Sequence, residues 1–457
     1  MKRYDAIVIG AGQAGPPLAK ALGKAGQKVA IVERGAFGGT CINTGCTPTK
    51  TLVASAYVAH TATRAAEFGI VVPDGVTVDM RKVKARKDAI VDAWKAATES
   101  SLRAAPNCTV YRGHACFRSA GDVVVGGDVL SAGQIFIDVG GRAVVPSIPG
   151  LDSIDALTNS SMLDLDRLPG HLVVIGGGYV GLEFAQIYRR FGAAVSVVET
   201  APRLLPHEDE EISTAVREML KAEGVQMSVN ASGLSLARTG GGFTLTINAG
   251  SGGVTVDGTH LLLAVGRRPN TDDLGLQHAG VEVDGRGYIR VDDQLRTNVP
   301  GIWALGECNG RGAFTHTSYN DFEIVAGNLL RGENRSVKDR IPAYALYTDP
   351  PLGRVGMTEA EARKARRKVL VGRMAMADVA RAIEKGETAG LMKIVADGDT
   401  KEILGAAILG TGGDEAIHCI IDLMQARAPY TVLSHAMHIH PTVSELLPTI
   451  AQEMAPV

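Results

Sequence analysis

The sequence is poor in cysteine, in aromatic residues and in net charge. Its 457 residues include six cysteines and 5% aromatic residues, and the formal net charge is −2. So few cysteines do not form a disulfide framework. We therefore expect a reducing cytoplasm, where an intramolecular cysteine pair is more often catalytic than structural. The nearly balanced charge gives no reason to expect binding to nucleic acid or to an acidic membrane.

Long apolar runs are also absent. No stretch reaches the roughly 20 apolar residues that a membrane-spanning helix needs. The basic start of the chain is followed by Asp5 and then by glycines, so it does not have the pattern of a signal peptide. What the chain has in excess is glycine, with 55 residues, beside an ordinary hydrophobic content of 45%. This composition favours an α/β protein with many tight turns, and the length predicts two to four domains.

The first motif follows directly after the N-terminus. The stretch DAIVIGAGQAG predicts a short buried strand, three glycines in G-x-G-x-x-G spacing (Gly10, Gly12 and Gly15) and then a helix. A second strand, KVAIVE, ends in Glu33. The glycines allow a tight turn and close approach of a pyrophosphate to the helix N-terminus, and the carboxylate can accept bonds from a ribose hydroxyl. This unit predicts a dinucleotide site.

The same unit recurs later in the chain. Gly176, Gly178 and Gly181 follow a strand and precede a helix, and the next strand ends in Glu199. Two dinucleotide sites in one chain imply two different dinucleotides, and FAD with a nicotinamide nucleotide is the natural pair. Glu199 favours NADH because a carboxylate repels the 2′-phosphate of NADPH, although Arg203 could soften this preference, so NADPH stays possible.

Between the two units lies GGTCINTGCTPTK, in which Cys41 and Cys46 are five positions apart. In an ideal helix such residues are about 8–9 Å apart, beyond the roughly 7 Å limit between the Cα atoms of a disulfide. The segment therefore cannot be helical throughout. Gly45 permits unusual dihedral angles and Pro48 fits a first helical turn, which places Cys46 near a helix start, where a thiolate is stabilised. Alone, the pair could still be two unrelated buried thiols.

Other segments are less specific. Residues 81–103 predict a long helix whose basic first half is most simply a solvated face. Cys108 and Cys116 lack the further ligands of a zinc site, so we expect no metal site. A hairpin-rich tract follows at residues 226–257, and a helix is expected from about Ser318 to Arg331.

With these pieces in place, the chain resembles the class I pyridine nucleotide-disulfide oxidoreductases over essentially its whole length. The matching stretches, in the family's order, are GAGQAG, GGTCINTGCTPTK, GGGYVGLE, AVGRRPN, IWALGE and HIHPTVSE. The resemblance implies an α/β fold with two Rossmann-like dinucleotide-binding domains and a C-terminal α+β dimerisation domain. The implied bounds are 1–148 for FAD, 149–266 for NAD(P), 267–335 for a central domain completing the FAD site, and 336–457 for the dimer interface.

The resemblance also implies roles for individual residues. Cys46 looks like the thiol that faces the flavin in a charge-transfer contact, and Cys41 like the interchange thiol that meets the substrate. Lys50 matches a lysine beside the flavin's reactive nitrogen, with Glu183 as its ion-pair partner. Tyr179 occupies the position of a tyrosine that covers the flavin in some relatives until the nicotinamide enters.

Two further positions carry implied roles. Glu307 lies where the family has an aspartate that binds the ribityl chain, so the extra methylene must shift the backbone or the ribityl slightly. His440 and Glu445 match a dyad that exchanges protons with the interchange thiol across the interface of a homodimer, and His438 is a supporting residue. The remaining implied cofactor contacts are at Gly39, Thr40, His114, Ala115, Gly266 and Gly306.

The expected function is that of an FAD-dependent NAD(P)H:disulfide oxidoreductase that passes electrons through the Cys41/Cys46 disulfide to a low-molecular-weight disulfide or a soft metal ion. Some stretches look most like the mercuric reductase branch, but the C-terminal vicinal cysteines and the N-terminal metal-binding module of that branch are absent from the sequence. A dihydrolipoamide dehydrogenase is one alternative. A flavin-bound redox sensor or scaffold with low turnover is another.

Overall fold

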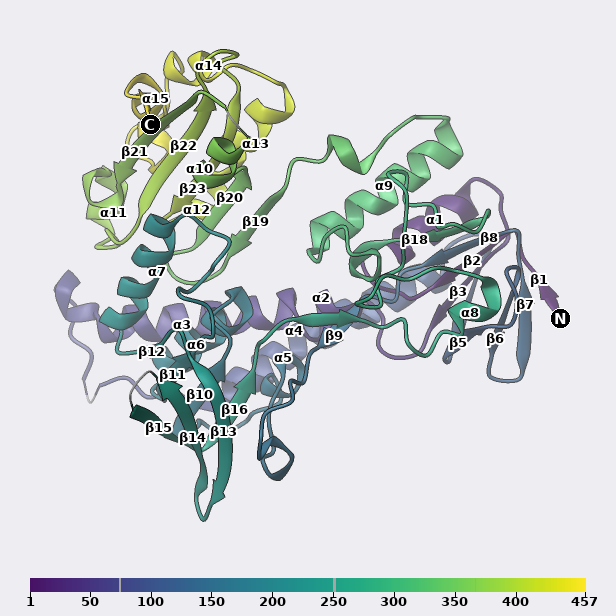
Figure 1. The fold of residues 1–457 in the computed structure, drawn as a ribbon, viewed down its shortest axis with the longest axis horizontal. Coiled ribbons are helices and arrows are strands. Elements are labelled where there is room, and N and C mark those ends of the chain that lie inside the picture. Colours follow the sequence, from purple (N-terminus) through teal and green to yellow (C-terminus); the bar gives the residue numbers. More distant parts are fainter. Residues whose placement is uncertain (74, 250–251, 366) are drawn as a thin grey trace.

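The computed structural model describes residues 1–73, 75–249, 252–365 and 367–457. It consists of three lobes, each built on its own sheet, which meet near the middle of the molecule (Figure 1). We call them the N-terminal, middle and C-terminal lobes. None of the helices in the described residues is long and apolar enough to cross a membrane.

The N-terminal lobe contains a parallel sheet in the order β18-β8-β2-β3-β4. Its central strand β2 is buried at every residue, because Ala6 and Val8 pack against helices on one face of the sheet, and Ile7 and Ile9 pack against the strands of a neighbouring sheet on the other. A second, four-stranded sheet, β1-β7-β6-β5, packs beside it. The strands are β1 (Lys2–Arg3), β2 (Ala6–Ile9), β3 (Val29–Glu33), β4 (Cys108–Arg112), β5 (Ala115–Phe117), β6 (Asp122–Val125), β7 (Asp128–Ser131), β8 (Gln134–Ile137) and β18 (Ile302–Ala304).

Helices α1 (Gly15–Lys24) and α9 (Thr315–Arg331) pack against each other in this lobe, and the short α8 (Leu276–Ala279) packs on β5. Helix α9 begins three residues before the expected Ser318. Its N-cap, Phe314, provides no capping side chain, so the usual sequence signal for a helix start is missing there.

The middle lobe repeats the first unit. Its parallel sheet has the order β12-β11-β10-β16, and the expected hairpin tract forms the antiparallel sheet β13-β14-β15. The ribbon of β9 and β17 connects this lobe to the N-terminal one. The elements are β9 (Gly141–Ala143), α5 (Asn159–Met162), β10 (His171–Ile175), α6 (Tyr179–Phe191), β11 (Ala194–Val198), α7 (Glu210–Ala222), β12 (Gln226–Ser228), β13 (Ser232–Thr239), β14 (Gly242–Ala249), β15 (Gly252–Gly258), β16 (His260–Leu263) and β17 (Arg267–Pro269).

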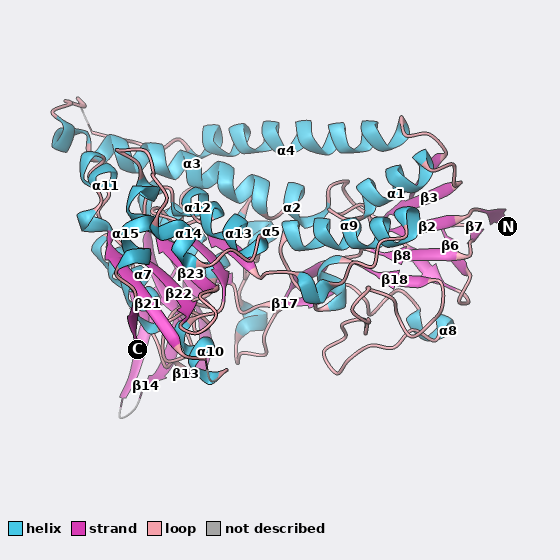
Figure 2. Cartoon of the chain, turned by 90° about the horizontal axis from the view of Figure 1, so that it is seen from above, coloured by secondary structure: helices cyan, strands magenta, loops and turns pink. Residues whose placement is uncertain are grey.

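Three helices run beside the junction of the lobes: α2 (Gly39–Asn43), α3 (Cys46–Thr63) and α4 (Met80–Arg103). Figure 2 shows α4 as a long rod that extends past α2 and α3. The expected helix at 81–103 is therefore confirmed, with a start one residue earlier. Asp79 caps it by accepting bonds from the amides of Arg81 and Lys82.

The C-terminal lobe is an antiparallel sheet in the order β19-β20-β23-β22-β21-β24 with helices around it, as the α+β expectation requires. The strands are β19 (Ala343–Leu346), β20 (Leu352–Gly356), β21 (Val369–Ala375), β22 (Leu391–Asp397), β23 (Ile403–Leu409) and β24 (Ala455–Pro456). The helices are α10 (Glu359–Lys364), α11 (Ala380–Glu384), α12 (Gly413–Ala416), α13 (His418–Gln425), α14 (Tyr430–Ser434) and α15 (Leu447–Gln452).

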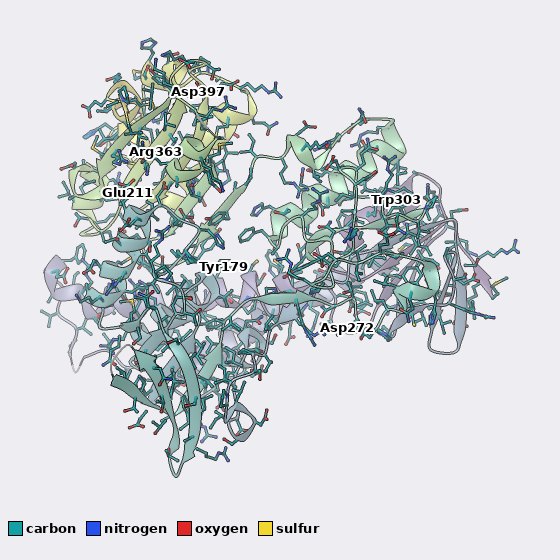
Figure 3. All side chains as sticks on the ribbon, in the orientation of Figure 1. Tyr179, Glu211, Asp272, Trp303, Arg363 and Asp397 are labelled. Atoms are coloured by element: carbon teal, nitrogen blue, oxygen red, sulfur yellow. The ribbon has the colours of Figure 1, made fainter. Side chains whose placement is uncertain are left out.

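A buried charge cluster joins the middle and C-terminal lobes. The ammonium of Lys393, whose side chain is 3% exposed, lies 2.9 Å from Asp209 and 2.8 Å from Glu359, and it also pairs with Glu211. Asp209 accepts bonds from the first amides of α10 as well. In Figure 3, Glu211 lies at this boundary between the two lobes. The cluster holds the start of α7 against the C-terminal lobe.

Candidate active site

A cavity of about 1520 Å³ lies where the three lobes meet. This exceeds the ~300–1,000 Å³ that is typical for one small ligand, so two ligands can share it. Tyr179, from the start of α6, is at this junction in Figure 3. Seventeen residues that the sequence predicted as site residues line the cavity: Gly10, Gly12, Glu33, Gly39, Thr40, Cys41, Cys46, Lys50, His114, Ala115, Gly176, Gly178, Tyr179, Glu183, Glu199, Gly266 and Glu307.

The two glycine motifs have the same geometry. Gly10 and Gly176 have φ angles of +107° and +117°, which disfavour any residue with a side chain. The third glycines, Gly15 and Gly181, do not line the cavity but lie beneath the turn. A Cβ atom on either would come within 2.2 Å of the carbonyl oxygen of the motif's first glycine. Close packing of helix on strand therefore requires glycine at both.

The carboxylates that end the second strands are held by backbone amides. Glu33 accepts bonds from the amides of Ala11 and Gly35, both at 2.7 Å. Glu199 accepts a bond from the amide of Gly177, in the second glycine motif, at 2.6 Å and one from the amide of Ala201 at 2.7 Å. A carboxylate has about four acceptor positions, so each can still accept from a ribose. Arg203 instead donates to carbonyl oxygens of the following loop, at 3.1 and 3.3 Å.

The two cysteines lie on either side of a break between α2 and α3. Cys46 begins α3, as expected, after Gly45 with φ −137° and ψ −114°. Both are free thiols in this structure. A hydrogen bond from Cys41, a second from Thr315 and the charge of Lys50 lower the pKa of Cys46 to about 5. The same Cys46 bond, together with burial, raises the pKa of Cys41. At neutral pH the pair is therefore a thiolate beside a thiol.

Lys50 and Glu183 form an ion pair beside these thiols. The ammonium donates to the two carboxylate oxygens at 2.8 and 3.1 Å, and it lies 4.6 Å from the centre of the Tyr347 ring. Glu183, whose side chain is 4% exposed, also accepts a bond from the Tyr347 amide at 2.9 Å. The carboxylate is thus fixed by two elements, which fixes the cation in turn.

An aromatic group lines the cavity wall next to α6. The rings of Tyr179 and Phe314 have centroids 5.5 Å apart, and Phe314 stacks on Tyr344 at 5.4 Å with an angle of 6° between the rings. Burial raises the pKa of Tyr179, which therefore stays neutral. The role of Tyr179 as a cover over the flavin stays a prediction. The sequence analysis did not single out Phe314.

Glu307 has a partner that the sequence did not suggest. Its two carboxylate oxygens accept bonds from Arg267 at 2.6 and 2.9 Å, and both side chains are mostly buried. Gly141 makes room for the longer side chain, because a Cβ atom there would lie 2.7 Å from Cδ of Glu307. The extra methylene is thus accommodated by a glycine in β9 and an arginine in β17. The contact with a ribityl chain stays a prediction.

The dyad of His440 and Glu445 forms away from the cavity. Nδ1 of His440 is 2.7 Å from the carboxylate of Glu445, and the histidine side chain is 75% exposed. Neither residue lines the cavity of its own chain. This placement is what a residue acting on a second subunit requires, and that role stays a prediction. His438 bonds the carbonyl oxygen of Ser444 at 2.6 Å.

Two further predicted positions, Gly306 and His114, lie at the cavity. Gly306 lies beneath the cavity, where a Cβ atom would come within 2.7 Å of Ser318. His114 lines the cavity and bonds the carbonyl oxygen of Asp273 at 2.9 Å. Within the described residues, no group of three or more His, Cys, Asp or Glu side chains could hold a metal ion.

Asp138 and Thr315 are site residues that were not predicted from the sequence. Thr315 contributes a hydroxyl 3.3 Å from Sγ of Cys46. Asp138 follows β8 and is buried under the first glycine motif. Its position at the carboxyl end of a parallel strand, where α/β proteins bind ligands, was a usable signal. The contact of Thr315 had none, because it joins residues 269 positions apart.

The residues fit the two dinucleotides. Each motif has glycines where a phosphate must approach the backbone, a helix N-terminus above them and a carboxylate for a ribose. Both motifs open into the same cavity as the thiolate–thiol pair. A fold and site of this kind define an oxidoreductase that links a flavin, a pyridine nucleotide and a pair of cysteines.

The comparison with protein families agrees. Residues 4–321 match the pyridine nucleotide-disulphide oxidoreductase family, and residues 342–451 match the dimerisation domain of these enzymes. The chain belongs to the pyridine nucleotide-disulphide oxidoreductase family. It is an FAD- and NAD(P)H-dependent enzyme, and its dimerisation domain supports a homodimer.

Several curated proteins are similar over almost their full lengths. The probable pyridine nucleotide-disulfide oxidoreductase RclA of Escherichia coli is 36% identical over 461 residues, which cover 98% of each chain. A dihydrolipoyl dehydrogenase of Thermus scotoductus is 34% identical, covering 99% of this chain and 98% of the other. A mercuric reductase of Streptomyces lividans is 32% identical, covering 98% and 96%.

Among solved structures, the Cu(II) complex of the HOCl-induced flavoprotein disulfide reductase RclA from Escherichia coli aligns with a TM-score of 0.89. The alignment has 34% sequence identity and covers 99% of both chains. A structure of RclA titled without copper aligns with the same TM-score. The fold class expected from the sequence is therefore confirmed, while the domain bounds given there stay predictions.

Proposed function

We propose that the enzyme uses NADH to reduce its cysteine pair, which then reduces a low-molecular-weight disulfide or a soft metal ion. The observation that supports this most directly is the asymmetry of the pair, with Cys46 as thiolate and Cys41 as thiol, in the cavity that both dinucleotide motifs share. Family membership favours an enzyme over the low-turnover sensor or scaffold.

FAD, bound at the N-terminal motif, supplies a two-electron relay between NADH and the disulfide. Lys50, held by Glu183, provides a positive charge at the cavity wall, which favours an anionic reduced flavin and the Cys46 thiolate alike. Glu33 and Glu199 would hold the two riboses, and Tyr179 would cover the position that the nicotinamide enters.

Once the disulfide is reduced, Cys41 is the nucleophile. Its sulfur attacks one sulfur of the substrate disulfide, the substrate's S–S bond breaks, and one thiol leaves after taking up a proton. The Cys46 thiolate then attacks Cys41, which restores the Cys41–Cys46 bond and releases the second substrate sulfur as a thiolate that takes its proton from water. His440 of the second subunit, oriented by Glu445, accepts the proton of Cys41 and returns it to the leaving thiol.

A soft metal ion is the second substrate class. One solved relative is titled as a Cu(II) complex and another relative is named mercuric reductase. Thiolates prefer soft ions, so Cys41 and Cys46 are suitable ligands.

We infer a preference for NADH over NADPH. Both oxygens of Glu199 are held by amides at the ribose position, and Arg203 is engaged with carbonyl oxygens of its own loop. No swing of Arg203 toward a 2′-phosphate is possible without breaking those two bonds.

The alternative is a dihydrolipoamide dehydrogenase, which the similarity to the Thermus scotoductus enzyme favours. One experiment separates the two. The purified holoenzyme is tested for NADH oxidation with glutathione-type disulfides, lipoamide and Cu(II), and for NADH formation from NAD⁺ and dihydrolipoamide. Rapid dihydrolipoamide oxidation with little disulfide or Cu(II) turnover would overturn the proposal. Cys41→Ser should abolish turnover of disulfides while leaving the flavin bound.

A further inference from the structure

Asp138 is a buried acid that the proposed reaction does not use. It follows β8 directly, is 6% exposed, and accepts a bond from the Gly15 amide at 2.7 Å. Gly15 is the first residue of α1, whose own N-cap provides no side-chain bond. Asp138 therefore caps this helix from a different part of the chain.

The carboxyl group is packed between glycines of the FAD motif. Cβ atoms on Gly12 and Gly15 would lie 2.9 and 3.1 Å from Oδ2, and one on Gly306 would lie 3.0 Å from Oδ1. The residue also lines the cavity. Any charge on it is therefore directly beneath the turn at which a diphosphate binds in this motif.

The groups that face Asp138 are acids or a thiol. Glu33 comes from β3, Asp321 from α9, and Cys308 from the turn after β18. Asp321 is itself paired with Arg340, and within the described part of the chain no ion pair joins Asp138 to a lysine, arginine or histidine. Burial, followed by the charges of Asp321 and Glu33, raises the pKa of Asp138 to about 8.

We propose that Asp138 determines how tightly the chain holds FAD, because the cofactor's diphosphate binds against α1 only while this carboxyl carries a proton. A neutral carboxyl caps the helix and leaves its positive N-terminal end available to the phosphates. An ionised one neutralises that end and repels them. The inference rests on FAD occupying the N-terminal motif, and it is independent of the electron acceptor.

Proton linkage fixes the expected pH dependence. Since FAD binds the protonated form, its dissociation constant should be constant at low pH and rise by up to about tenfold for each pH unit above the midpoint. Asp138→Asn keeps an acceptor for the Gly15 amide and cannot ionise. Its dissociation constant should therefore stay flat over the same range.

The test measures free flavin by fluorescence after dilution of the holoenzyme at pH 6 to 10 and constant ionic strength, with circular dichroism as a check on folding. Asp399→Asn, the same change at a carboxylate that is 73% exposed in the C-terminal lobe, is the control and should keep the wild-type profile. Retention that is pH-independent in the wild type, or equally pH-dependent in Asp138→Asn, overturns the proposal. If Asp138→Asn does not fold, the pH profile of flavin retention in the wild type is compared instead with that of Asp138→Ala, which cannot ionise at this position either.

The readout also separates this inference from the proposed function. If the N-terminal motif bound the nicotinamide nucleotide instead, Asp138→Asn would change the pH dependence of the KM for NADH and leave flavin release unchanged. Failure to reduce disulfides or copper would leave the flavin measurement unaffected.

Discussion

Replacing Lys50 by methionine tests the electrostatics of the site most directly. The pKa of Cys46 is about 5, and the ammonium of Lys50 is one of three groups that lower it. An opposite charge within 4–6 Å lowers a pKa by about 1–3 units, and Lys50 is one-third exposed, so we take the lower part of that range. The variant also leaves the charge of Glu183, which raises the pKa of Cys46, without a counterion. Both effects raise the pKa, by about 1–2 units together.

The direction of the change in absorbance follows from the fraction of Cys46 that is ionised. At pH 6 a group with a pKa of 5 is about nine-tenths ionised, and one with a pKa of 6.5 about one-quarter. The assay is an anaerobic pH titration of the holoenzyme after reduction with one equivalent of NADH, following the long-wavelength charge-transfer absorbance of the Cys46 thiolate. Glu183→Gln should move the midpoint in the opposite direction, to lower pH, because it removes the opposing charge. Lys95→Met, on the exposed part of α4, is the control.

A midpoint in Lys50→Met at or below the wild-type value would refute this reasoning. Removing one partner of a buried ion pair can cost about 3–5 kcal/mol, and we expect about 1–2 kcal/mol here because Lys50 is partly solvated. Thermal unfolding checks that cost. The double variant Lys50→Met/Glu183→Gln, which has no unpaired charge, should recover stability and have a midpoint between the wild type and Lys50→Met.

Three further results are expected. Glu199→Ala should reduce the ratio of kcat/KM for NADH over NADPH by about tenfold, since one good charge-assisted contact is worth about 1.4 kcal/mol. An unchanged ratio in steady-state kinetics would show that the carboxylate does not bind the ribose hydroxyl. Gly141→Ala should lower flavin occupancy, measured by absorbance, because the added Cβ atom would lie 2.7 Å from Cδ of Glu307 and 2.9 Å from the carbonyl oxygen of Arg268. Unchanged occupancy would contradict the fit described here. Lys393→Met should lower the free energy of unfolding by about 3 kcal/mol in denaturant titrations, because three acidic partners lose their counterion; a change below about 0.5 kcal/mol would mean that the cluster contributes no net stability.

Much of the site was accessible from the residues alone. The glycine motifs, the two carboxylates and the helix start at Cys46 depend on local sequence, where spacing and backbone preferences act over a few residues. The division of roles between Cys41 and Cys46 came instead from family resemblance. The structure adds its physical basis, since one hydrogen bond lowers the pKa of one thiol and raises that of the other.

The parts that sequence could not give are contacts between distant segments. Arg267 and Glu307 are 40 positions apart, and their pairing depends on a glycine from a third segment. Thr315 is the first residue of α9, three residues before the expected start of that helix, and its contact with Cys46 spans 269 positions of sequence. The strand end at Asp138 can be recognised from the sequence, but its contact with the Gly15 amide cannot, because it joins residues 123 positions apart.

The fit of Glu307 against Gly141 also restricts the order in which such a site can change by mutation. A glutamate that arose while position 141 still had a Cβ atom would have met it at 2.7 Å. Glycine at 141 is needed whichever acid stands at 307, because a Cβ atom there would also lie 2.9 Å from the carbonyl oxygen of Arg268. The reverse path is restricted too, because shortening Glu307 leaves the mostly buried guanidinium of Arg267 without its two bonds. Arg267 and Glu307 should consequently be exchanged among related enzymes as a pair.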